Sequence, residues 1–254
     1  MSIAKGKLYL VPAPLDFGCD SQAPLHDVMP AGTLQIAARL CCWICENAKS
    51  TRAYLKRINE LHPWSTPVQA LRIQELPREV HKKGDHGGQF DARPLLAAAM
   101  EGRDIGLVSE AGMPAIADPG SSVVRAAHDL GLQVVPLTGP MSLMLALASS
   151  GLNGQHFAFV GYLPQDSSGR AQRIRELESL ALKTGQTQIF IETPYRNAAL
   201  LQGLLHTLQG NTRLALSCGI TLGGGVSRSA LASQWKRDKA VLPLDLPTVF
   251  CIGR

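Results

Sequence analysis

The sequence has few aromatic residues and no long apolar run. Phe, Trp and Tyr together make up 5% of its 254 residues. Its apolar stretches LYLVPAPL and MSLMLALASSG are too short to span a bilayer. Two prolines interrupt the first stretch, so it is not the apolar core of a signal peptide either. We therefore expect a cytoplasmic protein that makes no use of a membrane.

The sequence also lacks the motifs of several nucleotide-using enzymes. It contains no G-x-x-x-x-G-K-[ST], no G-x-G-x-x-G after a strand and no G-x-S-x-G elbow, which argues against an NTPase, a kinase or a serine hydrolase. No segment has the dense lysine and arginine run of a nucleic-acid tail. The net charge of +5, with a pI near 9.0, permits a polyanionic partner without requiring one.

Neither the cysteines nor the histidines show the spacing of a metal site. Cys42 and Cys45 form a C-x-x-C, but no second pair or histidine accompanies them, so we interpret LCCWIC as a buried strand with reduced thiols. His81 and His86 lie in the charged, glycine-rich segment PREVHKKGDHGGQF without a third ligand. We predict a mobile surface loop there, and no metal.

What the sequence does contain is a regular alternation of short apolar strands and helices. This pattern predicts βαβ units and a mainly parallel sheet. Gly131 is placed to end one of the helices. In the first half the expected strands are residues 7–13, 41–46, 71–76, 105–109 and 132–137, and the expected helices are 30–40, 50–58, 91–102 and 121–131.

The alternation continues after the proline- and glycine-containing segment Pro136 to Pro140. A second set of elements predicts a second α/β domain, with domains at 1–138 and 139–254 and a hinge between them. Ser168 is a candidate N-cap for one helix. In this half the expected strands are residues 156–163, 188–193, 213–220 and 247–253, and the expected helices are 142–151, 170–182, 196–208 and 229–237.

The segment SEAGMPAIADPG, from Ser109 to Gly120, is an unusual connection between a strand and a helix. Ligands of open α/β sheets bind outside the carboxyl ends of the strands, and small residues there let backbone approach a ligand closely. Glu110 and Asp118 suit a ribose or an ammonium group, and Pro119 biases Asp118 away from helical backbone. On residue chemistry alone, a helix-capping role for Asp118 is equally well supported.

Six segments occur in the order typical of one family: KLYLVPAPL, ENAKSTRAYL, GLVSEAGMPAIADPG, VVPLTGPMSLMLALASSGL, FAFVGYLP and IETPYRN. The chain thereby resembles the tetrapyrrole methylase superfamily of S-adenosylmethionine-dependent methyltransferases. It is most similar to the branch that methylates 16S ribosomal RNA on a ribose 2′-hydroxyl. The resemblance implies two α/β domains, with a mainly parallel N-terminal sheet, a mixed second sheet and a cofactor cleft between them, in a homodimer.

The resemblance also implies which residues meet the cofactor S-adenosylmethionine. The first domain would supply the small-residue loop and the Asp118–Pro119 turn, the hinge would supply TGPMS, and the second domain would supply two tyrosines. The implied cofactor-binding residues are Pro12, Ser109, Glu110, Ala111, Gly112, Asp118, Pro119, Gly139, Pro140, Ser142, Tyr162 and Tyr195.

The chain departs from the family pattern at several places. The first loop has Leu15-Asp16-Phe17 where the family has isoleucine followed by Gly-Asn, and Asn47 and Glu110 each stand where the family has Asp. The glutamate-rich segment expected after residues 213–220 is replaced by TLGGGVSRSALASQW. These departures leave the inherited RNA substrate less secure than the cofactor.

Glu46 and Arg52 are the candidate catalytic residues. Glu46 follows a strand at the same sheet edge as the small-residue loop, so we predict that it acts as a base or orients the acceptor. Arg52 is retained from the family motif. The alternative for Glu46 is a helix cap or an ion pair with Lys49 or Arg52.

The expected partner is ribosomal RNA in the small ribosomal subunit. Lys49, Arg52, Lys56 and Arg57 lie on or near one predicted helix and either meet RNA phosphates or are solvated, and Arg170, Arg173 and Arg175 have the same two interpretations. No aromatic platform for single-stranded RNA is obvious. We predict an RNA ribose methyltransferase; the alternatives are a methyltransferase of a small tetrapyrrole-like acceptor and a non-catalytic cofactor-binding module.

Overall fold

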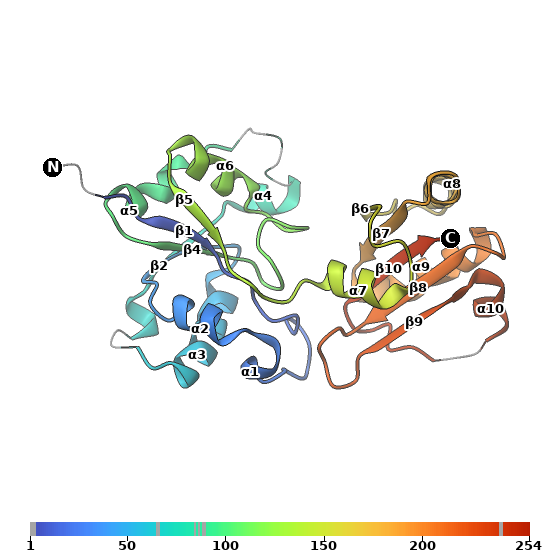
Figure 1. Ribbon diagram of the computed structural model, residues 1–254, viewed down its shortest axis with the longest axis horizontal. Helices are drawn as coiled ribbons and strands as arrows, with labels where there is room; N and C mark the ends of the chain where they lie inside the picture. The colour runs from blue at the N-terminus through green and yellow to red at the C-terminus, as the bar shows by residue number, and fades with distance from the viewer. Residues whose placement is uncertain (1–3, 65–66, 84, 86, 88–89, 239–240) are drawn as a thin grey trace. The chain divides into compact units, whose positions relative to one another are not determined.

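The computed structural model describes residues 4–64, 67–83, 85, 87, 90–238 and 241–254. The chain divides into two compact units, one formed by Met1–Gly18 with Gln22–Pro140 and the other by Cys19–Ser21 with Met141–Arg254. Each unit has its own five-stranded sheet (Figure 1). Among the described residues, no helix combines the length and the apolar character that a membrane span requires.

The first unit is built on a fully parallel sheet, as the alternating pattern predicts. Its strands lie in the order β3-β2-β4-β1-β5, and every neighbouring pair is parallel. The strands are β1 (Lys7–Leu10), β2 (Cys42–Cys45), β3 (Arg72–Glu75), β4 (Ile105–Val108) and β5 (Gln133–Pro136). The helices are α1 (Leu25–Val28), α2 (Ala31–Ala37), α3 (Ala48–Leu61), α4 (Arg78–Lys83), α5 (Ala97–Met100) and α6 (Ser121–Asp129), with short 3₁₀ turns η1 (Val68–Ala70) and η2 (Arg93–Leu96).

Alternate residues of the buried strands pack into two separate hydrophobic cores, one on each face of the sheet. Trp43 and Cys45 of β2 pack with α2 and α3 on one face, while Cys42 and Ile44 pack with α5 and α6 on the other (Figure 1). Cys42 and Cys45 are therefore core residues of a strand, as predicted. Gly131, with φ of 65°, follows the end of α6, again as predicted.

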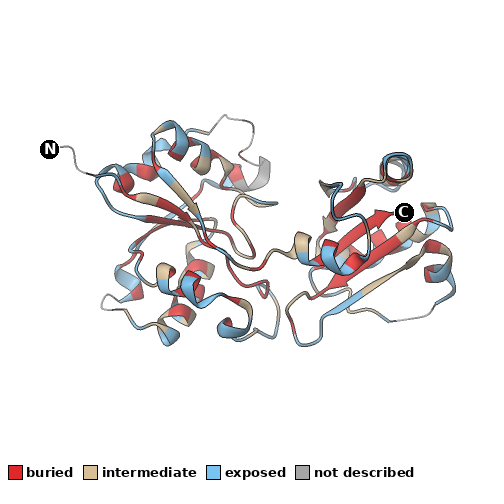
Figure 2. Ribbon diagram, viewed as in Figure 1, coloured by how far each residue is buried: buried red, intermediate tan, exposed pale blue. Residues whose placement is uncertain are grey.

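The second unit has a mixed sheet, which agrees with the expected fold class. Its strands lie in the order β6-β7-β10-β8-β9, with β6 and β7 parallel and the other pairs antiparallel. Buried residues concentrate in the three inner strands, β7, β10 and β8, and on the inner faces of the helices (Figure 2). The strands are β6 (Phe157–Tyr162), β7 (Thr187–Glu192), β8 (Arg213–Cys218), β9 (Val226–Leu231) and β10 (Thr248–Gly253), and the helices are α7 (Ser142–Ser150), α8 (Ser167–Thr184), α9 (Pro194–Thr207) and α10 (Ala232–Arg237).

Two predictions for the second unit are wrong. The helix expected at 229–237 begins only at Ala232, because the preceding residues complete β9, which pairs antiparallel with β8 along its full length. Strand β9 was not predicted because it is an edge strand in which polar residues alternate with apolar ones, so it contains no apolar run. Ser168 does not cap α8; the carboxylate of Asp166 accepts a hydrogen bond from the Gly169 amide at 2.7 Å.

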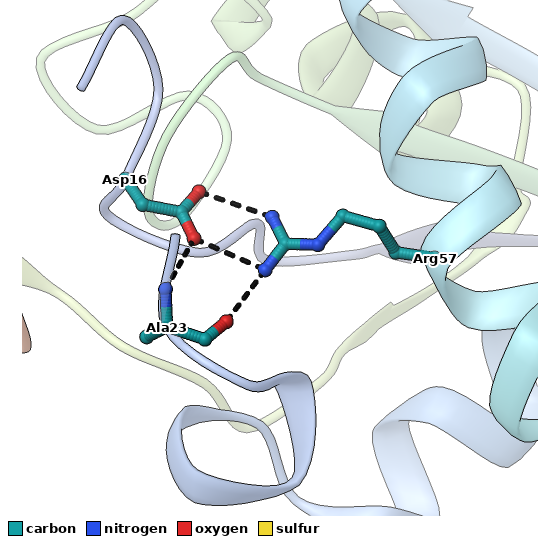
Figure 3. A network of polar contacts seen from close by, with 3 residues as sticks. All are labelled: Asp16, Ala23 and Arg57. Carbon is teal, nitrogen blue, oxygen red and sulfur yellow. Dashed lines mark hydrogen bonds and ion pairs between the residues drawn. The ribbon is translucent and has the colours of Figure 1, made fainter. Parts of the chain in front are cut away.

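An ion pair fixes the first loop against α3 in the first unit (Figure 3). Both carboxylate oxygens of Asp16, which is 4% exposed, accept hydrogen bonds from the Arg57 guanidinium at 3.1 Å. Arg57 also donates to the Ala23 carbonyl at 2.7 Å, and the Ala23 amide donates to Asp16 at 3.2 Å. Neither interpretation of Arg57, as an RNA contact or as a solvated side chain, is correct, because its charge is used within the protein.

Breaking this pair is expected to destabilise the protein strongly. Asp16→Ala leaves the Arg57 charge half-buried without its partner, which costs about 3 kcal/mol of unfolding free energy. Urea denaturation followed by circular dichroism measures the loss. Glu176→Ala removes the exposed partner of Arg173 and serves as control, with little or no change expected. Equal urea midpoints for the two variants would contradict a structural role for the Asp16 pair.

Candidate functional site

The carboxyl edge of the parallel sheet contains a topological switch point at β4. The chain leaves β1 and β2 toward α2 and α3, which cover one face, but it leaves β4 toward α6 on the opposite face. Because β4 lies between β1 and β2, its exit diverges from those of both neighbours. A crevice outside the strand ends at such a point is where open α/β sheets bind ligands.

The loop that leaves β4 has a strained and well-anchored backbone. Ala115 and Ala117 have φ of 65° and 63°, in the left-handed region that residues other than glycine seldom adopt. Such conformations cost on the order of 1 kcal/mol each and persist where the surroundings fix them. The first loop helps to hold the backbone of this loop in place, because Ala13 and Gly112 exchange two backbone hydrogen bonds at 2.9 and 3.0 Å.

The segment after β5 packs tightly against the first loop. A Cβ atom on Gly139 would lie 2.2 Å from Cγ of Pro12, so only glycine fits there. The carbonyl of Pro12 accepts a hydrogen bond from the Tyr54 hydroxyl at 2.9 Å, and that of Thr138 accepts one from the Thr33 hydroxyl at 2.6 Å. The predicted site residues Pro12, Gly112, Gly139 and Pro140 are thus brought together at one sheet edge.

Three carboxyl groups gather beside this loop. Burial, together with the negative charges of Glu46 and Glu110, raises the pKa of Asp118 to about 7. Among the described residues, the Asp118 carboxyl has neither a hydrogen-bond partner nor an ion-pair partner. Glu110 accepts a hydrogen bond from the Ser50 hydroxyl at 3.1 Å. The Asp118 carboxyl is only partly exposed, so a ligand that brings a cation or a hydrogen-bond donor would stabilise its charged form.

Asp118 does not cap the helix that follows it, because Asp85 does. The Asp85 carboxylate accepts hydrogen bonds from the backbone amides of Gly120 and Ser122, both at 2.9 Å, and from the hydroxyls of Ser121 and Ser122. Burial alone would raise the pKa of Asp85, but these hydrogen bonds outweigh it and hold the pKa below its usual value.

The prediction of a mobile surface loop is therefore wrong for the described residues of this segment. The segment contains helix α4 and the buried residue Asp85, which is 5% exposed. The glycine-rich composition of this segment gave no indication of a helix cap, because Asp85 lies 35 residues before Gly120, which begins the capped helix end. His86 and the side chain of His81, named above as weak metal candidates, lie outside the described residues.

Glu46 lies where the sequence places it, at the carboxyl end of β2 beside β4. The cap of α3 is Asn47, whose side-chain oxygen accepts from the Lys49 and Ser50 amides at 2.9 and 3.3 Å, so the capping alternative for Glu46 is wrong. Arg52 lies half-buried on the same helix and donates to the Ala48 carbonyl at 3.4 Å.

A pocket of about 240 Å³ opens beside Glu46 at the ends of β2, β3 and β4. Its walls include Glu75 and Arg78, which the sequence interpretation missed. Glu75 ends β3 and accepts a hydrogen bond from the Ala48 amide at 2.6 Å. The sequence contained the information needed to include Glu75, because LRIQEL is a predicted strand whose carboxyl end lies at the same edge of the sheet. The full lining is Glu46, Asn47, Glu75, Leu76, Arg78 and Glu110.

Three predicted cofactor residues belong to the second unit. Ser142 begins α7, Tyr162 ends β6 and Tyr195 lies in the first turn of α9. Tyr162 and Tyr195 are 57% and 81% exposed. Tyr195 is adjacent to Arg196, which pairs with Glu192 at 2.7 Å and lies 5.3 Å from the tyrosine ring centroid. Because β6 and β7 are parallel, both tyrosines lie at the carboxyl edge of that strand pair.

The first unit is a doubly wound α/β unit, defined by its parallel sheet, its switch point and the loop that leaves β4. The family model for the tetrapyrrole (corrin/porphyrin) methylases matches residues 37–222. The chain belongs to this family, as the sequence motifs indicate.

Curated relatives carry the name ribosomal RNA small subunit methyltransferase I. The protein of that name from Vibrio cholerae is 38% identical over 137 residues, which are 54% of this chain and 46% of the relative. The one from Escherichia coli is 32% identical over 218 residues, 86% of this chain and 66% of the relative. The matched part of the chain thus spans between about half and two thirds of the length of these relatives.

Solved structures share the fold at low sequence identity. The uroporphyrin-III-C-methyltransferase of Thermus thermophilus is 18% identical with a TM-score of 0.52, over 98% of this chain and 92% of that one. The methyltransferase CobJ is 16% identical with a TM-score of 0.58, over 98% of this chain and 94% of that one. The two sheets of this chain, one parallel and one mixed, thus match the fold of these methyltransferases.

Proposed function

We propose that this chain binds S-adenosylmethionine at the carboxyl edge of its parallel sheet and methylates a ribose 2′-hydroxyl of ribosomal RNA. The observation that carries the proposal is the partly buried Asp118 carboxyl beside Glu46 and Glu110, without a hydrogen-bond or ion-pair partner of its own among the described residues. Such a group suits a ligand that brings an ammonium group, a sulfonium charge and hydroxyl donors.

The residues around Asp118 fit this cofactor. Ser109 is 5% exposed, and its hydroxyl has no hydrogen-bond partner among the described residues. Ala111 and Gly112 present almost no side chain, which lets a ligand approach the backbone. We assign the cofactor to Ser109, Glu110, Ala111, Gly112, Asp118 and Pro119, with Pro12, Gly139 and Pro140 beside them. When bound, the cofactor supplies a methyl group on a sulfonium, ready for in-line displacement.

The chain's own contribution to transfer is to position the acceptor and to accept its proton. Glu46 is one of three carboxylates at the wall of the pocket, and we assign it to take the proton of the acceptor hydroxyl. Asn47 has no basic group, and its side chain caps α3. Arg52, on that helix, is assigned to the acceptor side, where its charge attracts a phosphate.

The ribosomal RNA acceptor is supported by the names of the curated relatives and by exposed cations on α3. Lys49 and Lys56 are exposed beside the site, and Arg52 is half-buried. For the second unit we assign Ser142, Tyr162 and Tyr195 to the cofactor, following the family resemblance. A homodimer stays a prediction of that resemblance, which sedimentation analysis of the purified chain tests.

Methyl transfer to isolated small ribosomal subunits tests the proposed function directly. The subunits come from cells that lack the modification, and the cofactor carries a radiolabelled methyl group. We expect label in RNA, and Glu46→Gln is expected to lower kcat about 100-fold while leaving cofactor affinity within about threefold.

The matched control is Glu60→Gln, an exposed carboxylate on the same helix α3, which should leave kcat unchanged. Label that enters a small tetrapyrrole-like acceptor but not RNA would refute the substrate class. Full activity of Glu46→Gln would remove Glu46 from the mechanism. Cofactor binding without transfer to either acceptor would favour a non-catalytic binding module.

A further inference from the structure

A second pocket of the first unit lies at the opposite edge of the sheet from Glu46. It has a volume of about 610 Å³, within the usual range for small-molecule sites. Its residues follow the ends of α2 and α3 or precede β2 and β3, so they lie at the amino ends of these strands. The lining is Ala38, Arg39, Leu40, Cys41, Leu61, His62, Pro63, Trp64 and Leu71.

The side chains of this pocket offer hydrogen-bond donors and apolar surface, but no carboxylate. The side chains of Arg39 and His62 make no hydrogen bond or ion pair with any residue that the structure describes. The indole Nε1 of Trp64 is buried and likewise has no acceptor within the described part of the chain. Donors without acceptors at one concave site favour a ligand that carries anionic oxygens.

Apolar side chains of the same pocket suit a planar group. Trp64 packs against the core beneath α3 while it also lines the pocket, and its backbone amide is held by Asn59 at 2.9 Å. Leu61 is 45% exposed beside it. An indole fixed from behind, with an arginine nearby, is the arrangement that proteins use to stack a base and hold its phosphate.

We propose that this pocket binds a nucleotide, with the phosphate at Arg39 and His62 and the base against Trp64 and Leu61. The ligand is either a free mononucleotide or one unit of a single-stranded RNA. Arg39 is suited to the phosphate because its planar guanidinium matches two phosphate oxygens at once. The site is separate from the proposed cofactor site, since the two lie at opposite ends of β2.

Tryptophan fluorescence tests this proposal, because the other two tryptophans are shielded. Trp43 and Trp235 are 1% and 5% exposed, so quenching by a ligand reports on Trp64. AMP and a single-stranded RNA decamer are each titrated in the presence of saturating S-adenosylhomocysteine, which keeps them out of the cofactor site. We expect saturable quenching, weakened about tenfold in Arg39→Gln. Arg125→Gln, which changes an exposed arginine of α6 across the sheet, is the control and should bind as the wild type does.

The two ligands distinguish the sources of the nucleotide. Tighter binding of the decamer than of AMP identifies RNA as the ligand, and equal binding identifies a free nucleotide; both support the site. The proposal is overturned if neither ligand quenches fluorescence at millimolar concentration. It is also overturned if Arg39→Gln binds with wild-type affinity and Trp64→Leu, which folds by circular dichroism, gives wild-type calorimetric binding.

Discussion

Asp118→Asn is expected to weaken S-adenosylmethionine binding by about 100-fold or more, while making the ligand-free protein more stable. The carboxyl is partly buried beside two other acids, and no described residue pairs with it, so a cationic ligand would be a fitting partner. Asparagine keeps the shape but cannot carry the charge that attracts a cation. It also removes a charge that is disfavoured by burial and by repulsion from Glu46 and Glu110, which should raise the unfolding free energy by about 1–2 kcal/mol at neutral pH.

The pH dependence of both effects follows from the raised pKa of Asp118. The folded protein holds the Asp118 proton up to about pH 7, whereas an unfolded chain releases it near the ordinary value of 3.8. Between these values the folded state binds more protons, so the Asp118 contribution to stability falls as the pH rises from about 4 to about 7. A cationic ligand prefers the ionised carboxylate, so its affinity should rise with pH through neutrality and fall below it.

Titration calorimetry and urea denaturation at about pH 5 and about pH 8 measure both expectations on the same samples. Asp129→Asn, an exposed carboxylate at the far end of α6, is the matched control and should change neither. Wild-type affinity in Asp118→Asn would remove Asp118 from the cofactor site. Loss of binding together with loss of stability would show instead that Asp118 has a structural role.

The strands of the parallel sheet could be predicted from the sequence because buried strands form recognisable apolar runs. CCWIC and IGLVS are short, continuous apolar runs, as parallel strands covered on both faces must be. Strand β9 has the opposite character: it lies at a sheet edge, with Val226 and Ser227 exposed, and its serines resemble a loop or a helix start. Edge strands are specified by their partner more than by their own residues.

Contacts between distant segments are what the sequence pattern could not supply. The loop motif from Ser109 to Gly120 is recognisable from its composition, but the strain at Ala115 and Ala117 and the anchoring of Gly112 on Ala13 depend on a second loop. In the same way, Asp16 appeared only as a departure from the family pattern. Its pairing with Arg57 shows that the altered first loop is fixed by a different contact.

Asp85→Ala is expected to be the other variant with a large effect, through stability rather than through ligand contact. It removes a buried carboxylate that accepts four hydrogen bonds at the start of α6, including those from Gly120 and the Ser122 amide. Loss of such a cap should lower the unfolding free energy by about 2–4 kcal/mol. Since Gly120 ends the small-residue loop, cofactor affinity should also fall, but only about threefold to tenfold, because the binding groups themselves remain.

The lowered pKa of Asp85 gives this variant a distinctive pH profile. The cap stabilises the folded state fully above the ordinary carboxyl pKa of 3.8, and its contribution is lost as the pH falls through the lower folded value. The difference in stability between wild type and Asp85→Ala should therefore be constant near neutrality and shrink in acid. Asp129→Ala, at the exposed end of the same helix, should show no such difference at any pH. If Asp85→Ala and Asp129→Ala unfold at the same urea concentration, the α6 cap does not hold the loop, and the order of the site has another source.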